Sequence, residues 1–364
     1  MISNGFTGPL LDRYLANGWY RMGVRMFSCR YSFQPWGFLS TVWTRLPLDG
    51  HAFPRSVAKL LRRNARRYRH EVHPARATAA EETVFARYAA CKAYDLQESA
   101  AAYLVCDPQA PFDTWQVSVF DRDSDELVAF SYFDRGARSL QSIGGYYDPA
   151  RERDSLGLYT LALEVAWAKE RGMAHHYAGY IVPGNEVFEY KRRVGPLECY
   201  DDVRRRWYPI DELDRDQLPD AIQRQALEAY HDLYTGLDEP FSVRLRPQYF
   251  IGISQRDLQW VRREQLPFAV TDVRANRRPF WACHLYSFNF RRYFSLLCTS
   301  HAYELESVSM PRSLMQRPDP MKRYEHVGSG VSVSLLHYRN RPYELEDLQR
   351  VWWAVERANE RARG

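Results

Sequence analysis

The chain has 364 residues, of which 45% are hydrophobic and 26% charged, a composition typical of folded proteins long enough for two or three domains. Its net charge of +5 excludes a uniformly polybasic chain that would bind its partners by charge alone. No apolar run reaches the roughly 18 residues of a transmembrane helix, and residues 1–18 lack a signal-peptide pattern. We therefore expect a cytoplasmic protein with no membrane partner.

A first short helix is expected to end at Asn17-Gly18, because glycine there can adopt the left-handed cap conformation. A second helix is predicted over residues 53–76, with Ser56 as its N-cap and Pro74 at its end. The apolar stripe of this second helix would consist of Val57, Leu61, Ala65, Tyr68 and Val72.

The opposite side of the second helix is basic, with no acidic residue before Glu71. Surface helices usually mix charges, because like charges one turn apart repel each other. One interpretation is a face that binds nucleic-acid phosphates, which would make binding depend strongly on salt. The alternative is an ordinary solvated face. The residues assigned to tRNA binding under the first interpretation are Lys59, Arg62, Arg63, Arg66 and Arg67.

Residues 81–104 are expected to form one helix or two, followed by the strands of an antiparallel sheet. These strands are predicted at 114–120, 126–133 and 140–148, the first two as a hairpin. Gly144-Gly145 inside the third strand predicts a bulge or a close approach of another group to the backbone.

A charged loop then leads into a helix predicted over Ser155–Arg171 and a strand over 174–181. Hairpins followed by a strand–helix–strand crossover predict an α+β fold with an acyltransferase-like sheet. After Ile210 the sequence becomes a C-terminal extension with charged helical segments and short aromatic segments. The expected domains are residues 1–76, 77–210 and 211–364.

The charged loop before Leu156 is the strongest candidate site. A helix N-terminus exposes unpaired backbone N–H groups, which favour an anion or a developing oxyanion. Gly157 would let a ligand approach this backbone closely. The alternative is that Asp154-Ser155 only caps the helix.

The residues predict neither a metal site nor a cofactor. His175 and His176 have no second His or Cys at ligand spacing. The six cysteines contain no Cys-x-x-Cys pair and are expected to be free thiols, mostly buried. They are Cys29, Cys91, Cys106, Cys199, Cys283 and Cys298.

Three stretches carry a family resemblance: "LANGWYRMG" (15–23), "TRLPLDGHAFPRSVAKLLRRN" (44–64) and "YYDPARERDSLGLYTLALEVAWAKERGMAHHYAGYIVPGNEVFEYKRRVGPLE" (146–198). The chain resembles the aminoacyl-tRNA–protein transferases, the arginyl and leucyl enzymes that tag protein N-termini for degradation. The positions of the third stretch that match the family pattern are Asp148, Pro149, Ser155, Leu156, Gly157, Tyr159, Tyr177, Gly179, Tyr180, Tyr190, Lys191, Pro196 and Glu198.

The resemblance implies a GNAT-like fold, a mixed sheet with flanking helices in which one pair of strands splays apart. It implies transfer of an amino acid, arginine first and leucine second, from aminoacyl-tRNA to the α-amine of an acceptor protein or peptide. The catalytic residues it implies are Asp148, Ser155 and Gly157. Those that would bind substrate are Tyr147, Leu156, Tyr159, Tyr177, Tyr180, Tyr190 and Lys191.

Within this resemblance Asp148 would orient or deprotonate the acceptor amine, whereas the residues alone equally allow an Asp-Pro turn that Asp148 caps. Two features depart from the family pattern: only Cys29 remains where the family often carries cysteine pairs, and residues 211–364 have no counterpart in the short bacterial enzymes. Two alternatives therefore stay open, an acyl-CoA-dependent GNAT N-acyltransferase and a non-catalytic tRNA- or peptide-binding homologue.

Overall fold

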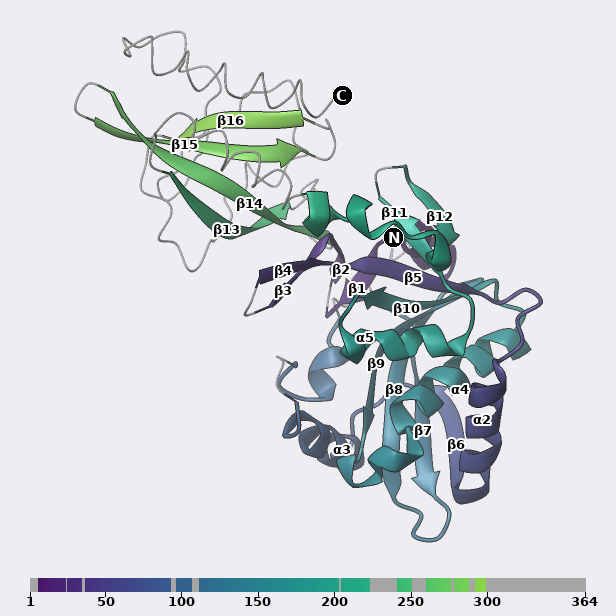
Figure 1. Ribbon diagram of the computed structural model, residues 1–364. Helices are drawn as coiled ribbons and strands as arrows, with labels where there is room; N and C mark the ends of the chain where they lie inside the picture. Colours follow the sequence, from purple (N-terminus) through teal and green to yellow (C-terminus); the bar gives the residue numbers. More distant parts are fainter. Residues whose placement is uncertain are drawn as a thin grey trace, which may run out of the picture. The chain divides into compact units, whose positions relative to one another are not determined.

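The computed structural model contains two compact units (Figure 1). Unit 1 comprises Met1–Ser28 and Thr41–Leu213, and unit 2 comprises Cys29–Ser40 and Asp214–Gly364. The structure describes residues 6–23, 25–34, 37–92, 96–106, 111–202, 204–222, 241–250, 260–275, 278–287 and 292–298.

An eight-stranded sheet forms the centre of unit 1, with the strand order β12-β11-β5-β10-β9-β8-β7-β6. Its strands are β5 (Val42–Pro47), β6 (Tyr68–Pro74), β7 (Thr114–Asp121), β8 (Leu127–Arg135), β9 (Ser139–Tyr147), β10 (His175–Ile181), β11 (Glu198–Asp201) and β12 (Arg206–Pro209). Neighbouring strands are antiparallel except β9 and β10, which are parallel. The predicted α+β class with a mixed sheet is therefore confirmed.

Helices cover both faces of this sheet. They are α1 (Gly8–Ala16), α2 (Arg55–Arg67), α3 (Ala79–Ala89), α4 (Leu156–Glu170) and α5 (Glu186–Glu189), with 3-10 turns η1 (Ala101–Tyr103), η2 (Pro149–Asp154), η3 (Tyr190–Val194) and η4 (Ile210–Glu212). Side chains alternate between the faces of a strand. Phe130 and Tyr132 of β8 pack against α3, whereas Phe133 packs on Trp167 of α4. Helix α4 is the crossover between the parallel strands β9 and β10 (Figure 1).

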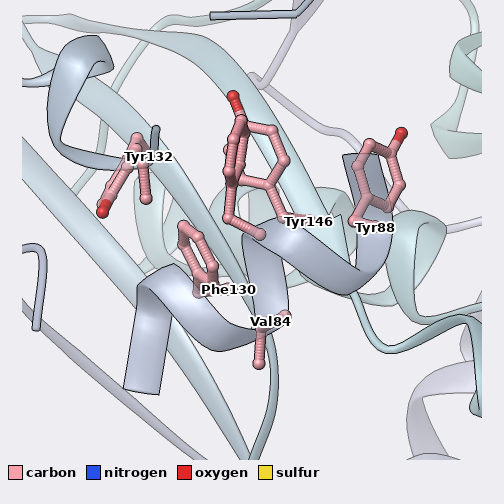
Figure 2. Packing of buried hydrophobic residues seen from close by; sticks show 7 residues of the cluster. Val84, Tyr88, Phe130, Tyr132 and Tyr146 are labelled. Carbon is pink, nitrogen blue, oxygen red and sulfur yellow. The ribbon is translucent and has the colours of Figure 1, made fainter. Parts of the chain in front are cut away.

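An aromatic cluster fills the space between α3 and the sheet (Figure 2). The ring of Tyr146 lies 5.1 Å from that of Phe130 and 5.6 Å from that of Tyr88. Val84 of α3 completes this core, and all four residues are buried. Edge-to-face and tilted ring pairs contribute about 0.5–1.5 kcal/mol each beyond their burial. The cluster fixes β9 up to its C-terminal end, where the predicted site begins.

The second predicted helix is shorter than expected. It ends at Arg67, and Tyr68–Pro74 form strand β6, which pairs with β7. The prediction failed because Tyr68 and Val72, four residues apart, fall on one face of a helix and equally on one face of a strand. The N-cap position is Pro54, not Ser56. A domain boundary at residue 76 would cut through the eight-stranded sheet, since β5 and β6 belong to it.

The other predicted elements of unit 1 are close to those observed. Helix α1 ends at Ala16 with Asn17 as its C-cap residue, and Gly18 after the cap has a positive φ of 74°. The register between β8 and β9 shifts so that Ile143 is an extra residue beside Gly144, which is the predicted bulge. A short antiparallel pair, β1 (Tyr20–Met22) and β2 (Arg25–Cys29), precedes β5.

Unit 2 contains antiparallel strands in the described residues. They are β3 (Tyr31–Gln34), β4 (Gly37–Ser40), β13 (Phe241–Phe250), β14 (Trp260–Ala275), β15 (Arg278–Ser287) and β16 (Arg292–Cys298), with the 3-10 turn η5 (Arg215–Gln217) near its start. The charged helical segments predicted beyond residue 222 lie outside the described residues. In the described part of the chain, no helix combines the length and the hydropathy needed to cross a bilayer.

Candidate functional site

The two parallel strands separate along their length. Strands β9 and β10 pair at three positions, from His175 opposite Ser139 to Tyr177 opposite Gln141. Beyond these positions β9 continues to pair with β8, and β10 continues to pair with β5. We call residues 139–141 and 175–177 the closed end of the pair, and residues 142–147 and 178–181 its open end.

A backbone irregularity lies at the point of separation. The register between β10 and β5 shifts between His176 and Gly179, and Gly179 has a φ of 82°, a conformation that favours glycine. The Gly179 carbonyl accepts a hydrogen bond of 2.7 Å from Thr44 Oγ1. The bulge therefore turns β10 away from β9 while β5 still holds it.

Helix α4 starts beside the end of β9. Its N-cap residue, Ser155, has left-handed φ and ψ of 51° and 46°, and no side chain caps the helix. The Tyr159 N–H donates to the Ser155 carbonyl at 3.0 Å, which is the first intrahelical bond. The earlier N–H groups, from Leu156 to Leu158, have no acceptor within the helix. These N–H groups are hydrogen-bond donors at the positive end of the dipole of α4.

Gly157 lies against the ring of Tyr147. A Cβ at Gly157 would lie 3.4 Å from Tyr147 Cε1, a contact at the tight edge of the ordinary range. A methyl group therefore fits at this position with little movement, and a larger side chain would displace the tyrosine.

Asp148 follows β9 and caps η2 by accepting a 3.0 Å hydrogen bond from the Ala150 N–H. Its second oxygen accepts from Arg87 Nη1 at 3.0 Å, and the Arg87 side chain is 59% exposed. The turn interpretation of Asp148 is thus observed, and its role toward an acceptor amine stays a prediction. An exposed ion pair of this kind is worth at most about 1 kcal/mol, so an incoming ammonium can replace the guanidinium.

Two arginines of the predicted tRNA-binding face hold the loop before α4. Arg67 Nη1 lies 3.0 Å from Asp154 Oδ2, and Arg63 Nη2 donates to the Asp154 carbonyl at 3.1 Å. Asn64 and Tyr68 donate to Asp154 as well, at 2.8 and 2.6 Å. These contacts fix the exit of η2 and thereby the start of α4.

The other three basic side chains of the predicted tRNA-binding face are exposed to solvent. Lys59, Arg62 and Arg66 are exposed and form no ion pair or hydrogen bond within the part of the chain that the structure describes. Their spacing of three and four residues places them on one side of α2, together with exposed Arg55. We call these four residues the α2 basic stripe. The predicted face of five therefore divides into three residues of this stripe and two structural arginines.

Lys191 in η3 reaches the open end of the strand pair. Its Nζ donates to the Tyr180 carbonyl at 2.8 Å. Burial lowers the pKa of Lys191 to about 8, although the charge of Glu164 partly opposes this shift. Glu164 of α4 is fully buried and pairs with His176 of β10 at 3.0 Å.

The other predicted substrate-binding residues fall into two groups. Leu156, Tyr159 and Tyr177 are at most 2% exposed, so they belong to the core that supports the site. Tyr147 and Tyr180 are half-buried at the open end, and Tyr190 is exposed.

Sequence reasoning missed the Glu164–His176 pair. The available signal was a single carboxylate in the otherwise apolar run from Leu156 to Ala168, which had to be paired if buried. It also missed Arg87, the partner of Asp148, because ion-pair partners on separate elements leave no local pattern.

No group of three or more metal-ligating side chains occurs among the described residues. Cys29, Cys91, Cys106 and Cys199 form no disulfide bond.

Comparison with known proteins identifies the family. A family profile described as "Arginine-tRNA-protein transferase, C terminus" matches residues 65–201, which contain both ends of the strand pair and α4. The aspartate/glutamate leucyltransferase of Gluconacetobacter diazotrophicus is 31% identical over 190 residues, 50% of this chain and 68% of that protein. The chain belongs to the aminoacyl-tRNA–protein transferase family. This family comprises aminoacyl-tRNA-dependent acyltransferases, and the chain is an enzyme of that class.

Other relatives carry the same name. The aspartate/glutamate leucyltransferase of Phenylobacterium zucineum is 32% identical over 164 residues, 43% of this chain and 63% of that protein. That of Stenotrophomonas maltophilia R551-3 is 34% identical over 92 residues, 25% of this chain and 36% of that protein. The chain thus spans about a third to two thirds of the length of these curated transferases. Among solved structures, L-PGS from Bacillus licheniformis is 14% identical with a TM-score of 0.33, covering 40% of this chain and 48% of that one. A score this low carries no argument about fold or function.

Proposed function

We propose that the protein transfers leucine from leucyl-tRNA to the α-amine of an acceptor whose N-terminal residue is aspartate or glutamate. The curated relatives are named for this reaction, and none of those described above supports arginine, the first expectation from the sequence. The observation that carries the proposal is the open end of β9 and β10 beside the uncapped start of α4.

The reaction needs little chemical assistance. An α-amine has a pKa near 8, so about a tenth of it is neutral at pH 7 and can attack the ester carbonyl carbon. The C–N bond forms, the tetrahedral oxyanion collapses, and the C–O bond to the tRNA ribose breaks. The proton that the amine loses ends on the ribose oxygen. Positioning two reactants can supply about 7–11 kcal/mol of the barrier.

The residues at the open end suit this positioning. The N–H groups at Gly157 and its neighbours would donate to the oxyanion, with the Ser155 hydroxyl beside them. Asp148 would exchange Arg87 for the acceptor ammonium and hold the amine near the ester. Tyr147 and Tyr180 would line the opening from β9 and β10.

We extend the proposal to the fold and to the tRNA. A mixed sheet with one splayed parallel pair and a crossover helix supports a GNAT-like fold. The α2 basic stripe would contact tRNA phosphates, because it carries four exposed cations that have no ion-pair partner among the described residues. A tRNA-bound donor suits the cytoplasmic location expected from the sequence.

Donor competition tests the proposal. Purified protein would receive labelled Leu-tRNA, Arg-tRNA or acetyl-CoA with peptides that begin with Asp, Glu, Lys or Arg. We expect label on the Asp and Glu peptides from Leu-tRNA only. Transfer from Arg-tRNA would show that arginine is the transferred amino acid. Transfer from acetyl-CoA would establish the acyl-CoA-dependent alternative, and tRNA binding without any transfer would establish the non-catalytic alternative.

A further inference from the structure

Lys191 is a cation without an ion-pair partner in the part of the chain that the structure describes. An ammonium has three N–H donors, and Lys191 uses one of them, on the Tyr180 carbonyl. It forms no ion pair among the described residues, although it is half-buried. A cation removed from water without a carboxylate lowers stability, so its retention calls for a partner that arrives from outside.

The nearest acidic group is already engaged. Glu164 influences Lys191 through its charge, but its Oε2 lies 3.0 Å from His176 Nε2. Both residues of this pair are fully buried between α4 and β10. Glu164 is therefore engaged by His176 and forms no direct ion pair with Lys191.

The ammonium of Lys191 lies beside the backbone of Gly179 and two aromatic rings. At Gly179 a Cβ would lie 3.4 Å from Lys191 Nζ, and the positive φ of Gly179 disfavours such a side chain. The rings of Tyr180 and Phe188 lie 5.8 and 5.6 Å from Nζ. Apolar rings reduce the local dielectric response, which strengthens the attraction between the ammonium and an anion.

We propose that Lys191 binds the side-chain carboxylate of the acceptor's N-terminal residue and is the residue that selects aspartate or glutamate. This inference rests on the proposed function, because it assumes that the acceptor enters at the open end of the strand pair. The ammonium would donate its two unused N–H groups to the carboxylate oxygens. The α-amine of the same residue would then lie toward Asp148, at the end of the opposite strand.

Lys191→Met tests this assignment, with Arg193→Gln as the matched control. Arg193 is exposed, lies two residues away in η3, and has no partner among the described residues. Transfer of leucine to peptides that begin with Asp and with Asn would be compared as kcat/KM. We expect Lys191→Met to lower the value for the Asp peptide by about 100-fold, the loss typical of a charge partner, and that for the Asn peptide by less than threefold. The control variant should keep the wild-type ratio.

Two outcomes would overturn the assignment. Equal losses for both peptides would mean that Lys191 serves the chemistry or the packing, and an unchanged Asp preference would place selection elsewhere. Lys191→Arg should restore part of the preference.

Calorimetric binding of the two peptides without tRNA separates this inference from the proposed function. Suppose that the wild-type protein transfers no leucine yet binds the Asp peptide more tightly than the Asn peptide. If Lys191→Met abolishes this difference in affinity, only the proposed function fails. If the wild-type protein binds both peptides equally, the assignment of Lys191 fails.

Discussion

The closed and open ends of the β9–β10 pair differ in how their polar groups are satisfied. At the closed end the strands pair directly, and Gln141 accepts a 3.1 Å hydrogen bond from the Arg21 N–H. At the open end Lys191 has no ion-pair partner among the described residues, and α4 starts without a side-chain cap. The Asp148 carboxylate is held there by its own turn and an exposed arginine.

The comparison shows how one pair of strands can serve both stability and function. Pairing at the closed end fixes the spacing of β9 and β10, and the bulge near Gly179 then separates them. Lys191 and the start of α4 lie at the open end, where a substrate can contact them. Variants at the open end should therefore change activity far more than stability.

Asp148→Asn should give the largest effect. The substitution keeps the shape of the turn and removes the charge that would hold the acceptor ammonium. We expect the transfer rate to fall by roughly ten- to a thousand-fold, about 1.4–4 kcal/mol of barrier, with tRNA affinity nearly unchanged. The measurement is single-turnover transfer from Leu-tRNA.

Arg87→Gln is the control for Asp148. It removes the exposed partner but leaves the carboxylate free for an ammonium, so the rate should be retained. Equal losses in the two variants would mean that the Asp148–Arg87 ion pair is structural and that the turn interpretation is complete.

The α2 basic stripe should determine the salt dependence of tRNA binding. Replacing Lys59, Arg62 and Arg66 by Gln should reduce the slope of log affinity against log salt by about 2–3, at 0.7–0.9 for each lost phosphate contact. The control variant carries the same loss of charge at three other exposed sites, Arg13, Arg76 and Arg138, all replaced by Gln. A slope that falls equally in both variants would leave the stripe an ordinary solvated face.

The preference for Asp over Asn peptides should depend on pH. Lys191 has its pKa lowered to about 8 by burial, and the groups that face it are Glu164 from α4, paired with His176, and the Tyr180 ring from β10. Above that pH the free enzyme loses the ammonium, so the kcat/KM ratio of the two peptides should fall about tenfold per pH unit. Below it the ratio should be constant.

Taking the ratio cancels the titration of the acceptor amine, which is common to both peptides. The matched variant is Lys191→Met, in which the ratio should be near one at every pH. A wild-type ratio that stays constant between pH 7 and 10 would contradict the assignment of Lys191.

Gly157→Ala should give the smallest effect. Alanine favours the helix by about 1 kcal/mol relative to glycine, and its Cβ would only contact Tyr147. The free energy of unfolding should change by less than about 1 kcal/mol, while transfer falls by up to about tenfold if the donor approaches this backbone. Full activity in a folded variant would make Gly157 a packing residue.

The sequence predicted local features well and tertiary ones poorly. Hairpin strands, the bulge beside Gly144 and the start of α4 follow from turn residues and periodicity, which act over short distances. The prediction of the boundary between α2 and β6 was wrong, because the spacing of Tyr68 and Val72 suits a helix and a strand equally well.

Contacts between distant segments could not be read from local patterns. Arg63 and Arg67 of the predicted tRNA-binding face contact Asp154. They lie 91 and 87 positions from Asp154 in the sequence. Lys59, Arg62 and Arg66 stay exposed because no such partner lies near them among the described residues, and their role toward tRNA stays a prediction. The Asp148–Arg87 and Glu164–His176 pairs likewise depend on the fold.

Hydrogen–deuterium exchange tests the central claim, that donor and acceptor meet at the open end of the strand pair. The protein would be measured with a tRNA that carries leucine through a stable amide bond, and then with an Asp-ended peptide added. We predict new protection at residues 142–148, 156–158 and 178–191, and no change in the turn at 121–126. Protection confined to other segments, with these residues exchanging as in the free protein, would contradict the account.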